Sequence, residues 1–243
     1  MTILYVNGDS HAAAAECVNP HAWAFDDEFY WGLGQRPHPD NEKASFGCEL
    51  ANWLFAALYC DAQAGGSNRR IMRTTRRWLL DQHDVKDVFL VIQWSTWERE
   101  EWFDGDAGWL QVNASGIDQV PEHYQQRYKE FVSNIDWKKC TEQAHEQIWQ
   151  FHQELEAQGI RHVMFNGNSH FDRVSKQYDW GASYIHPYSA ENTYNSILKN
   201  HGFKTVAPDS WHFGPDAHCF WGEYLLQYIK RNQLLRPDEI PVN

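Results

Sequence analysis

The chain has 243 residues, of which 42% are hydrophobic and 22% are charged. This balance is typical of a globular protein, and it excludes collagen, a coiled coil and a chain that is disordered throughout. The formal net charge is −12. We therefore expect neither nucleic acid nor an anionic membrane surface as a partner.

The cysteines and the apolar runs bear on the cellular compartment. The cysteines number 5, an odd and scattered set with no Cys-x-x-Cys pair, so neither a disulfide framework nor a zinc ribbon is expected. No apolar run reaches membrane-spanning length, and the N-terminus lacks the features of a signal peptide. These patterns favour a cytoplasmic protein, and a virion component would have the same signature.

Short apolar runs alternate with amphipathic segments along the chain. The pattern predicts strands over 2–6, 88–94 and 160–165, and helices over 46–58, 124–135, 144–155 and 217–228. This alternation is typical of an α/β fold with a mostly parallel sheet and helices on both faces. Because no linker or repeat interrupts it, we expect one domain over 1–243, with 19–45 as an insertion or lid loop.

Ligand sites in such sheets lie beyond the carboxyl ends of the strands, so the residues after each strand are the first candidates. The first predicted strand is followed by Gly8-Asp9-Ser10. A serine in a tight glycine turn that enters a helix exposes its hydroxyl beside free backbone N–H groups. The alternative is an ordinary turn with Ser10 as a helix N-cap.

Two further segments carry candidate chemistry. In Asp209-Ser210-Trp211-His212, the aspartate can accept the Nδ1–H of the histidine, which leaves Nε2 free to deprotonate a serine. The alternative is an aspartate that caps a turn beside a surface histidine. In the small-residue segment 62–68, Gly66 allows backbone N–H groups to approach a ligand closely, although a flexible turn has the same composition.

Taken together, Gly8-Asp9-Ser10, Gly66 and Asp209-x-x-His212 resemble the SGNH (GDSL-type) hydrolase family, with its members from tailed phages the closest in layout. The resemblance implies a flavodoxin-like three-layer α/β/α sandwich and an esterase, lipase, thioesterase or carbohydrate O-deacetylase activity. It implies that Ser10 is the nucleophile, that His212 is the general base and that Asp209 orients His212. The N–H groups of Ser10 and Gly66 would contribute to the oxyanion hole.

One block departs from the family pattern. The family usually has Gly-x-Asn-Asp after the third strand, whereas this chain has Gln93-Trp94-Ser95-Thr96, with Ser95 at the position of the asparagine. A hydroxyl donates a single hydrogen bond, and loss of one oxyanion donor costs about 10²–10³ in rate. Either Ser95 replaces the asparagine, or Asn68 supplies the amide, or the enzyme is slow.

The aromatic content bears on the substrate. The chain has 13 tryptophans, and we expect Trp94, Trp211 and Asn68 to contact the substrate. The expected substrate is a small-molecule or glycan ester, with an O-acetylated carbohydrate favoured, and we expect no metal and no organic cofactor. Two alternatives remain open: a catalytically weak carbohydrate-binding or structural protein on the same fold, and an O-acyltransferase. The sequence does not determine the oligomeric state.

Overall fold

The computed structural model describes residues 2–22, 37–82, 84–105, 108–116 and 120–236. Its strands are β1 (Ile3–Asn7), β2 (Ala57–Cys60), β3 (Val88–Trp94), β4 (Glu100–Phe103), β5 (Trp109–Val112) and β6 (Arg161–Asn166). Its α-helices are α1 (Pro39–Lys43), α2 (Phe46–Leu54), α3 (Asn68–Leu80), α4 (Gln125–Ser133), α5 (Trp137–Ala157), α6 (Tyr194–Asn200) and α7 (Pro215–Arg231). Short 3₁₀ helices lie at Val85–Asp87, Glu122–Tyr124 and Ala190–Asn192.

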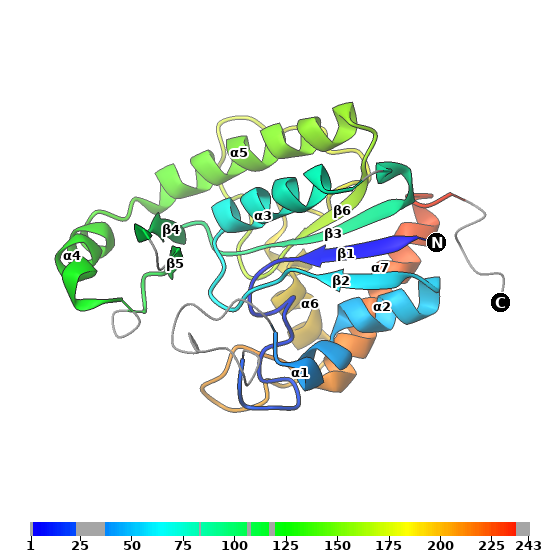
Figure 1. The fold of residues 1–243 in the computed structure, drawn as a ribbon, viewed down its shortest axis with the longest axis horizontal. Coiled ribbons are helices and arrows are strands. Elements are labelled where there is room, and N and C mark those ends of the chain that lie inside the picture. Colours follow the sequence, from blue (N-terminus) through cyan, green and yellow to red (C-terminus); the bar gives the residue numbers. More distant parts are fainter. Residues whose placement is uncertain (1, 23–36, 83, 106–107, 117–119, 237–243) are drawn as a thin grey trace.

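A parallel sheet forms the centre of the molecule (Figure 1). Its strand order is β2-β1-β3-β6, and every neighbouring pair is parallel. All of β3 is buried, as expected of a strand that is covered on both faces. Because the strands are parallel, their carboxyl ends meet at one edge, where Asn7, Cys60, Trp94 and Asn166 are the last residues.

Helices cover both faces of this sheet. In Figure 1, α3 and α5 lie on one face, and α2, α6 and α7 lie on the other. Successive residues of β1 serve opposite faces, because side chains alternate along a strand. Leu4 packs in the apolar cluster that includes Phe46 of α2 and Trp221 of α7, whereas Tyr5 packs in the cluster that includes Phe151 of α5. The predicted three-layer α/β architecture is therefore confirmed.

The predicted helix over 46–58 is too long by four residues. Ser45 caps α2 at its N-terminus, but Phe55 adopts a left-handed conformation with φ of 49° and ends the helix. The chain then runs alongside β1, and Ala57–Cys60 is β2. The apolar residues Ala57 and Leu58 therefore belong to a strand, because backbone pairing with β1 outweighs the helical spacing.

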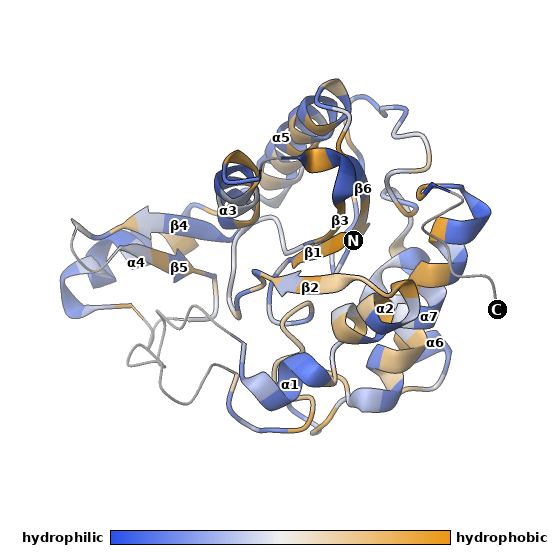
Figure 2. Ribbon diagram, turned by 45° about the vertical axis from the view of Figure 1, so that its right-hand side comes forward, coloured by the Kyte–Doolittle hydropathy of each residue, from blue (hydrophilic) through white to orange (hydrophobic). Residues whose placement is uncertain are grey.

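A second, small antiparallel sheet was not predicted. It consists of β4 and β5, and it lies with α4 beside the end of α5 (Figure 1). Trp102 of β4, Leu110 of β5 and Tyr128 of α4 form a separate apolar cluster there. In Figure 2, apolar residues are concentrated in β1 and β3 at the centre, whereas α1 is largely hydrophilic.

The predicted insertion or lid over 19–45 lies partly outside the described residues, which omit 23–36. Its two described ends are joined by Asn41. The Asn41 side chain accepts hydrogen bonds from the N–H groups of Val18 and Asn19, and it donates to the carbonyl groups of Asn19 and His21. In the described part of the chain, no helix is both long and apolar enough to cross a membrane.

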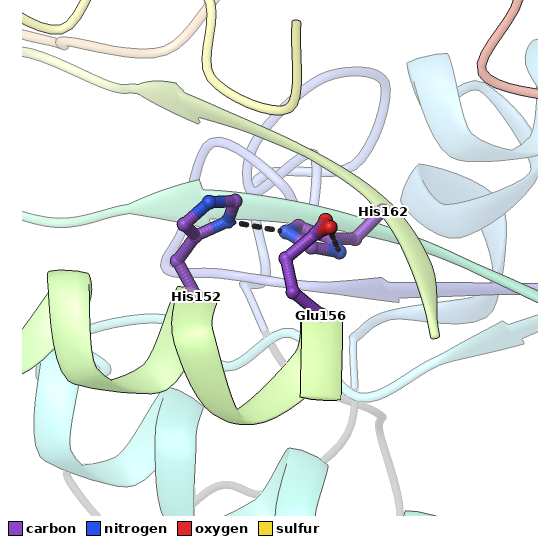
Figure 3. Close-up of side chains that lie close together, drawn as sticks. All are labelled: His152, Glu156 and His162. Carbon is purple, nitrogen blue, oxygen red and sulfur yellow. Dashed lines mark hydrogen bonds and ion pairs between the residues drawn. The ribbon is translucent and has the colours of Figure 1, made fainter. Parts of the chain in front are cut away.

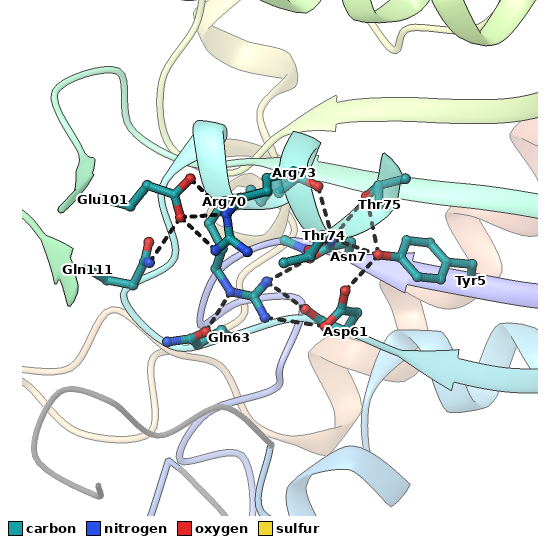
Figure 4. Close-up of polar contacts among 12 residues, drawn as sticks. Tyr5, Asn7, Asp61, Gln63, Arg70, Arg73, Thr74, Thr75, Glu101 and Gln111 are labelled. Atoms are coloured by element: carbon teal, nitrogen blue, oxygen red, sulfur yellow. Dashed lines mark hydrogen bonds and ion pairs between the residues drawn. The ribbon is translucent and has the colours of Figure 1, made fainter. Parts of the chain in front are cut away.

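A buried polar network supports the loop that follows β2 (Figure 4). Arg70 of α3 is only 4% exposed, and its guanidinium donates to the side chains of Asn7, Asp61 and Gln63 and to the carbonyl of Asp61. The backbone N–H of Gln63 in turn donates to the carbonyl of Gly8. The network thus fixes the residues after β2 against the turn after β1.

Candidate active site

The turn after β1 presents Ser10 at the carboxyl edge of the sheet. A Cβ atom at Gly8 would lie 2.6 Å from Ala12 Cβ and 2.7 Å from Gln93 Oε1, so only glycine fits there. The expected helix does not follow Ser10. The segment forms consecutive turns instead, because Ala14 and Glu16 adopt left-handed conformations with φ of 50° and 62°. Within the described residues, the Ser10 N–H has no acceptor.

Ser10 lines a cavity of about 740 Å³. Segments that follow β1, β2, β3, β5 and β6 contribute to the cavity wall together with the loop before α7. The wall includes Ser10, His11, Glu16, Gly65, Thr96, Glu98, Arg99, Gln111, Asn113, Ser115, Asn168, Asn195, Ser196, Lys199, Trp211 and His212. The cavity thus occupies the place where ligands bind in open α/β sheets.

A carboxylate holds His212 in the cavity wall, and it belongs to Glu16. Glu16 Oε2 lies 2.9 Å from His212 Nδ1 and also accepts a hydrogen bond of 2.8 Å from Ser210 Oγ. The hydrogen bond with His212 is the main cause that lowers the pKa of Glu16, and it outweighs the opposing effect of burial. With Nδ1 bound to a carboxylate, the proton-accepting position of a neutral His212 is Nε2.

This arrangement corrects the prediction for Asp209. The Asp209 side chain is exposed, and within the described residues it has no hydrogen bond or ion pair. Ser210 lies between the two: its hydroxyl accepts from the His212 N–H and donates to Glu16. The loop therefore turns His212 toward the segment after Ser10 and away from Asp209. No described hydrogen bond joins Ser10 Oγ to His212, and such bonds are often long before substrate binds.

The prediction for Ser95 also needs correction. Ser95 is fully buried, and its hydroxyl donates a 2.8 Å hydrogen bond to Asp9 Oδ2. Arg99 Nη1 lies 3.1 Å from the same oxygen. Burial alone would raise the pKa of Asp9, but Arg99, His11 and these hydrogen bonds lower it overall. Because a hydroxyl has one hydrogen, Ser95 cannot donate it to an oxyanion as well.

Three more predicted residues have structural partners. The Gly66 N–H donates to Gln63 O at 2.9 Å, so it is not available to an oxyanion. The glycine of this turn that lines the cavity is Gly65. The Asn68 side chain accepts from the Ser95 N–H at 2.8 Å and donates to the Ser95 carbonyl, which fixes the end of β3. Trp94 is fully buried and packs edge-on against Phe151 of α5. Trp94 therefore belongs to the core, because its side chain points to the face that α5 covers.

Trp211 lies where the sequence predicted, at the cavity wall. The residue is 64% exposed, and the Lys199 ammonium lies 5.2 Å from the centroid of its ring. An exposed aromatic face at a cavity mouth is available to a ligand. Its contact with substrate remains a prediction.

The structure brings three further residues to His212 and Ser10: Glu16, His11 and Asn168. Nothing in the sequence pointed to Glu16. His11 Nε2 accepts a 3.1 Å hydrogen bond from Asn168 Nδ2, and its ring centroid lies 5.5 Å from that of His212. Burial lowers the pKa of His11 to about 4, so this imidazole is neutral at neutral pH. Asn168 comes just after a strand, and this position in the sequence indicates a residue at the ligand-binding edge of the sheet. No spacing rule in the sequence connects Glu16 to His212.

Unpartnered buried polar atoms gather at the cavity. Buried polar groups normally have a hydrogen-bond partner, so such atoms mark where a ligand or ordered water satisfies them. Among the described residues of the cavity wall, these atoms are His11 Nδ1, Glu98 Oε2, Arg99 Nε and Asn195 Oδ1. The cavity wall contains no group of three clustered metal-binding side chains among the residues described; the group that has this composition is His152, Glu156 and His162, on α5 and β6.

Several solved structures are similar to this chain in layout. One is a protein from Desulfitobacterium hafniense described as lipolytic and of the G-D-S-L family, with 11% identity and a TM-score of 0.43 over 97% of this chain and 100% of that one. A carbohydrate esterase family 2 enzyme from Corynascus thermopiles has 13% identity and a TM-score of 0.44 over 96% of this chain and 66% of that one. An acetyl xylan esterase from Butyrivibrio proteoclasticus has 10% identity and a TM-score of 0.40, over 96% and 64%.

The chain thus spans about two thirds of the length of these two carbohydrate esterases. No curated protein matches the sequence. One sequence family does match, over residues 34–155, which is half of the 243-residue chain. The chain belongs to this family, a family of unknown function designated DUF6071.

Proposed function

We propose that this protein is a serine esterase whose triad is Ser10, His212 and Glu16. The observation that carries the proposal is the 2.9 Å contact between Glu16 Oε2 and His212 Nδ1 in the wall of the cavity that Ser10 also lines. A carboxylate on Nδ1, a free Nε2 and a serine in one cavity are the parts of a nucleophilic triad. The solved structures above share only low TM-scores with the chain, so the site itself carries the argument.

In the proposed reaction, Ser10 Oγ attacks the carbonyl carbon of an ester while His212 Nε2 takes the hydroxyl proton. The Glu16 carboxylate stabilises the imidazolium that forms. Collapse of the tetrahedral intermediate breaks the bond to the alcohol oxygen, which leaves with the proton from His212. Water then attacks acyl-Ser10 with His212 again as the base, and the acid is released.

Of the three expected oxyanion donors, Ser95 and Gly66 are already bonded within the protein, which leaves the backbone N–H of Ser10. The Ser10 N–H has no acceptor among the described residues. Asn168 Nδ2 has two hydrogens, and one donates to His11 Nε2. The other hydrogen is available, and Asn168 lines the cavity just after β6. We therefore assign Asn168 as the side-chain donor to the oxyanion, in place of the asparagine that the SGNH family has after the third strand.

The cavity wall favours an ester of a polar alcohol, such as a sugar, over an ester of a long-chain lipid. Gln111, Asn113 and Ser115, in and after β5, line one side, and Lys199 and the exposed Trp211 line another. Polar hydrogen-bonding groups beside one aromatic face suit a carbohydrate. An O-acetylated carbohydrate is therefore the proposed substrate class.

The first test is hydrolysis of p-nitrophenyl acetate by the wild-type protein and by Ser10→Ala at equal concentration. We expect the catalysed rate to disappear in Ser10→Ala. The matched control is Ser133→Ala, which removes an exposed serine hydroxyl of α4 outside the cavity wall and should retain activity. A fluorophosphonate probe, which loses fluoride when the serine oxygen attacks phosphorus, should label the wild type and Ser133→Ala at Ser10.

The two readouts separate a failed proposal from an unsuitable ester. Labelling of Ser10 without acetate hydrolysis would retain the nucleophile and direct the search to acetylated glycans and to acyl transfer. Neither labelling nor hydrolysis, with circular dichroism showing a folded protein, would refute the esterase proposal and favour a binding protein on the same fold.

A further inference from the structure

A second cluster of ionisable side chains lies away from the catalytic cavity. His152 and Glu156 are four residues apart on α5, so they share one face of the helix. His162 is the second residue of β6, at the amino end of the strand, whereas the catalytic cavity lies at the carboxyl end. Figure 3 shows His152 and Glu156 directed from the helix toward His162 on the strand.

The two histidine rings meet through nitrogen atoms. His152 Nδ1 lies 2.9 Å from His162 Nε2, and His162 Nδ1 lies 2.8 Å from the carbonyl oxygen of Ile160. A carbonyl can only accept, so His162 carries its hydrogen on Nδ1 and has a lone pair on Nε2. This is the backbone contact that commonly fixes the tautomer of a metal-binding histidine. Burial is also the main cause that lowers the pKa of both rings.

Glu156 places a carboxylate beside this pair. The side chain is 57% exposed, and one oxygen lies 3.9 Å from His162 Nδ1. One ligand atom from each of His152, Glu156 and His162 can be chosen so that all lie within 4.8 Å of one another. In a tetrahedral zinc site, neighbouring ligand atoms are about 3.3 Å apart, as bond lengths of 2.0–2.1 Å require. The exposed Glu156 carboxylate lies on the Nδ1 side of His162, so it must rotate toward Nε2 to complete such a ligand set.

The cluster borders solvent through Glu156, whereas both histidine side chains are buried. Glu156 and His162 line a cavity of about 790 Å³ that also contacts Arg161, Ser183 and residues after α7. A metal site needs such an entry path as well as a suitable ligand set. The open cavity leaves room for water as a fourth ligand.

We propose that His152 Nδ1, His162 Nε2 and Glu156 bind one Zn²⁺ ion between the end of α5 and the start of β6. Two imidazoles and one carboxylate suit zinc, whereas Mg²⁺ and Ca²⁺ prefer oxygen ligands alone. On binding, the His152 hydrogen moves from Nδ1 to Nε2, so that both facing nitrogens present lone pairs. Because the ion joins a helix to the neighbouring strand across the Gly159 turn, it stabilises this corner of the fold independently of the esterase site.

The test is a titration of the chelator-treated full-length protein with ZnCl₂, by isothermal titration calorimetry and by competition with a chromophoric chelator. We expect one Zn²⁺ per chain and a higher melting temperature in its presence. Co²⁺ should bind at the same place with the visible absorption of a tetrahedral site, and Mg²⁺ should not compete. Glu156→Gln should weaken Zn²⁺ binding at least about 10-fold, and His162→Ala should abolish it.

Glu156→Gln keeps the proposal testable if His162→Ala does not fold, because the Glu156 side chain is largely exposed. The matched control is His201→Ala, which removes an exposed histidine elsewhere and should leave the affinity unchanged. The proposal is refuted if Zn²⁺ binds the wild type at less than one ion per chain. It is also refuted if Glu156→Gln and His152→Ala bind Zn²⁺ as the wild type does. Neither outcome depends on esterase activity.

Discussion

The sequence predicted Asp209 as the acid of the triad, whereas in the structure the carboxylate at His212 belongs to Glu16. Glu16→Gln keeps the shape of the side chain and an oxygen that can accept from His212 Nδ1, but it removes the negative charge. Asp209→Asn makes the same chemical change at the residue that the sequence favoured. We expect Glu16→Gln to lower kcat/KM and Asp209→Asn to leave it nearly unchanged, because only Glu16 contacts the imidazole.

The size of the effect follows from the geometry. His212 becomes positively charged in the transition state, at 2.9 Å from the carboxylate oxygen. Two unit charges at that distance attract by about 1.4 kcal/mol in bulk water and by about 6 kcal/mol at an effective dielectric constant of about 20. The Glu16 side chain is 37% exposed, so solvent screens the attraction strongly. We therefore expect a loss of about 1.5–3 kcal/mol, which is about 10- to 150-fold in kcat/KM.

The assay is p-nitrophenyl acetate hydrolysis across a range of substrate concentrations, with Ser10→Ala as the background. Asp209→Asn should differ from the wild type by less than about twofold, as expected of an exposed carboxylate without a contact. The assignment of Glu16 would be refuted by an undiminished rate in Glu16→Gln. An equal loss in Asp209→Asn would show that the loop before α7 rearranges during catalysis and that the aspartate reaches His212.

Two further predictions concern stability. Arg70→Met should lower the free energy of unfolding by about 3 kcal/mol, because it leaves the Asp61 carboxylate beside α3 without its buried cation; Arg76→Met, which breaks an exposed ion pair, should cost less than about 1 kcal/mol in the same urea titration. Burial lowers the pKa of His11 to about 4 and of His218 to about 3. Histidine in the unfolded chain titrates at about pH 6.5, so below that pH the unfolded chain binds more protons than the folded chain. As the pH falls from there to the folded pKa, each of the two histidines should lower the free energy of unfolding by about 1.4 kcal/mol per pH unit. Urea unfolding midpoints that stay constant from about pH 7 to about pH 5 would contradict this reasoning.

Local patterns in the sequence were sufficient for the fold class. Continuous apolar runs such as Val88–Trp94 identify strands that are covered on both faces, and amphipathic segments between them identify the helices that cover the sheet. The sequence also pointed to the carboxyl edge of the sheet, because parallel strands bring their ends together there. Gly8 and Ser10 could be singled out for the same reason, since a tight turn after β1 requires glycine and exposes the next polar side chain.

The partners of those side chains were decided by tertiary structure alone. Glu16 and His212 are separated by almost the whole chain, and they meet because left-handed residues after Ser10 turn the chain toward the loop before α7. Ser95 lies where the family resemblance implied a donor, but the buried charge of Asp9 takes its hydrogen. Hydrophobicity and spacing in the sequence indicate which face of a helix or strand a residue lies on. Which hydrogen-bond donor a buried charge takes depends on distances between side chains, and these exist only in the folded chain.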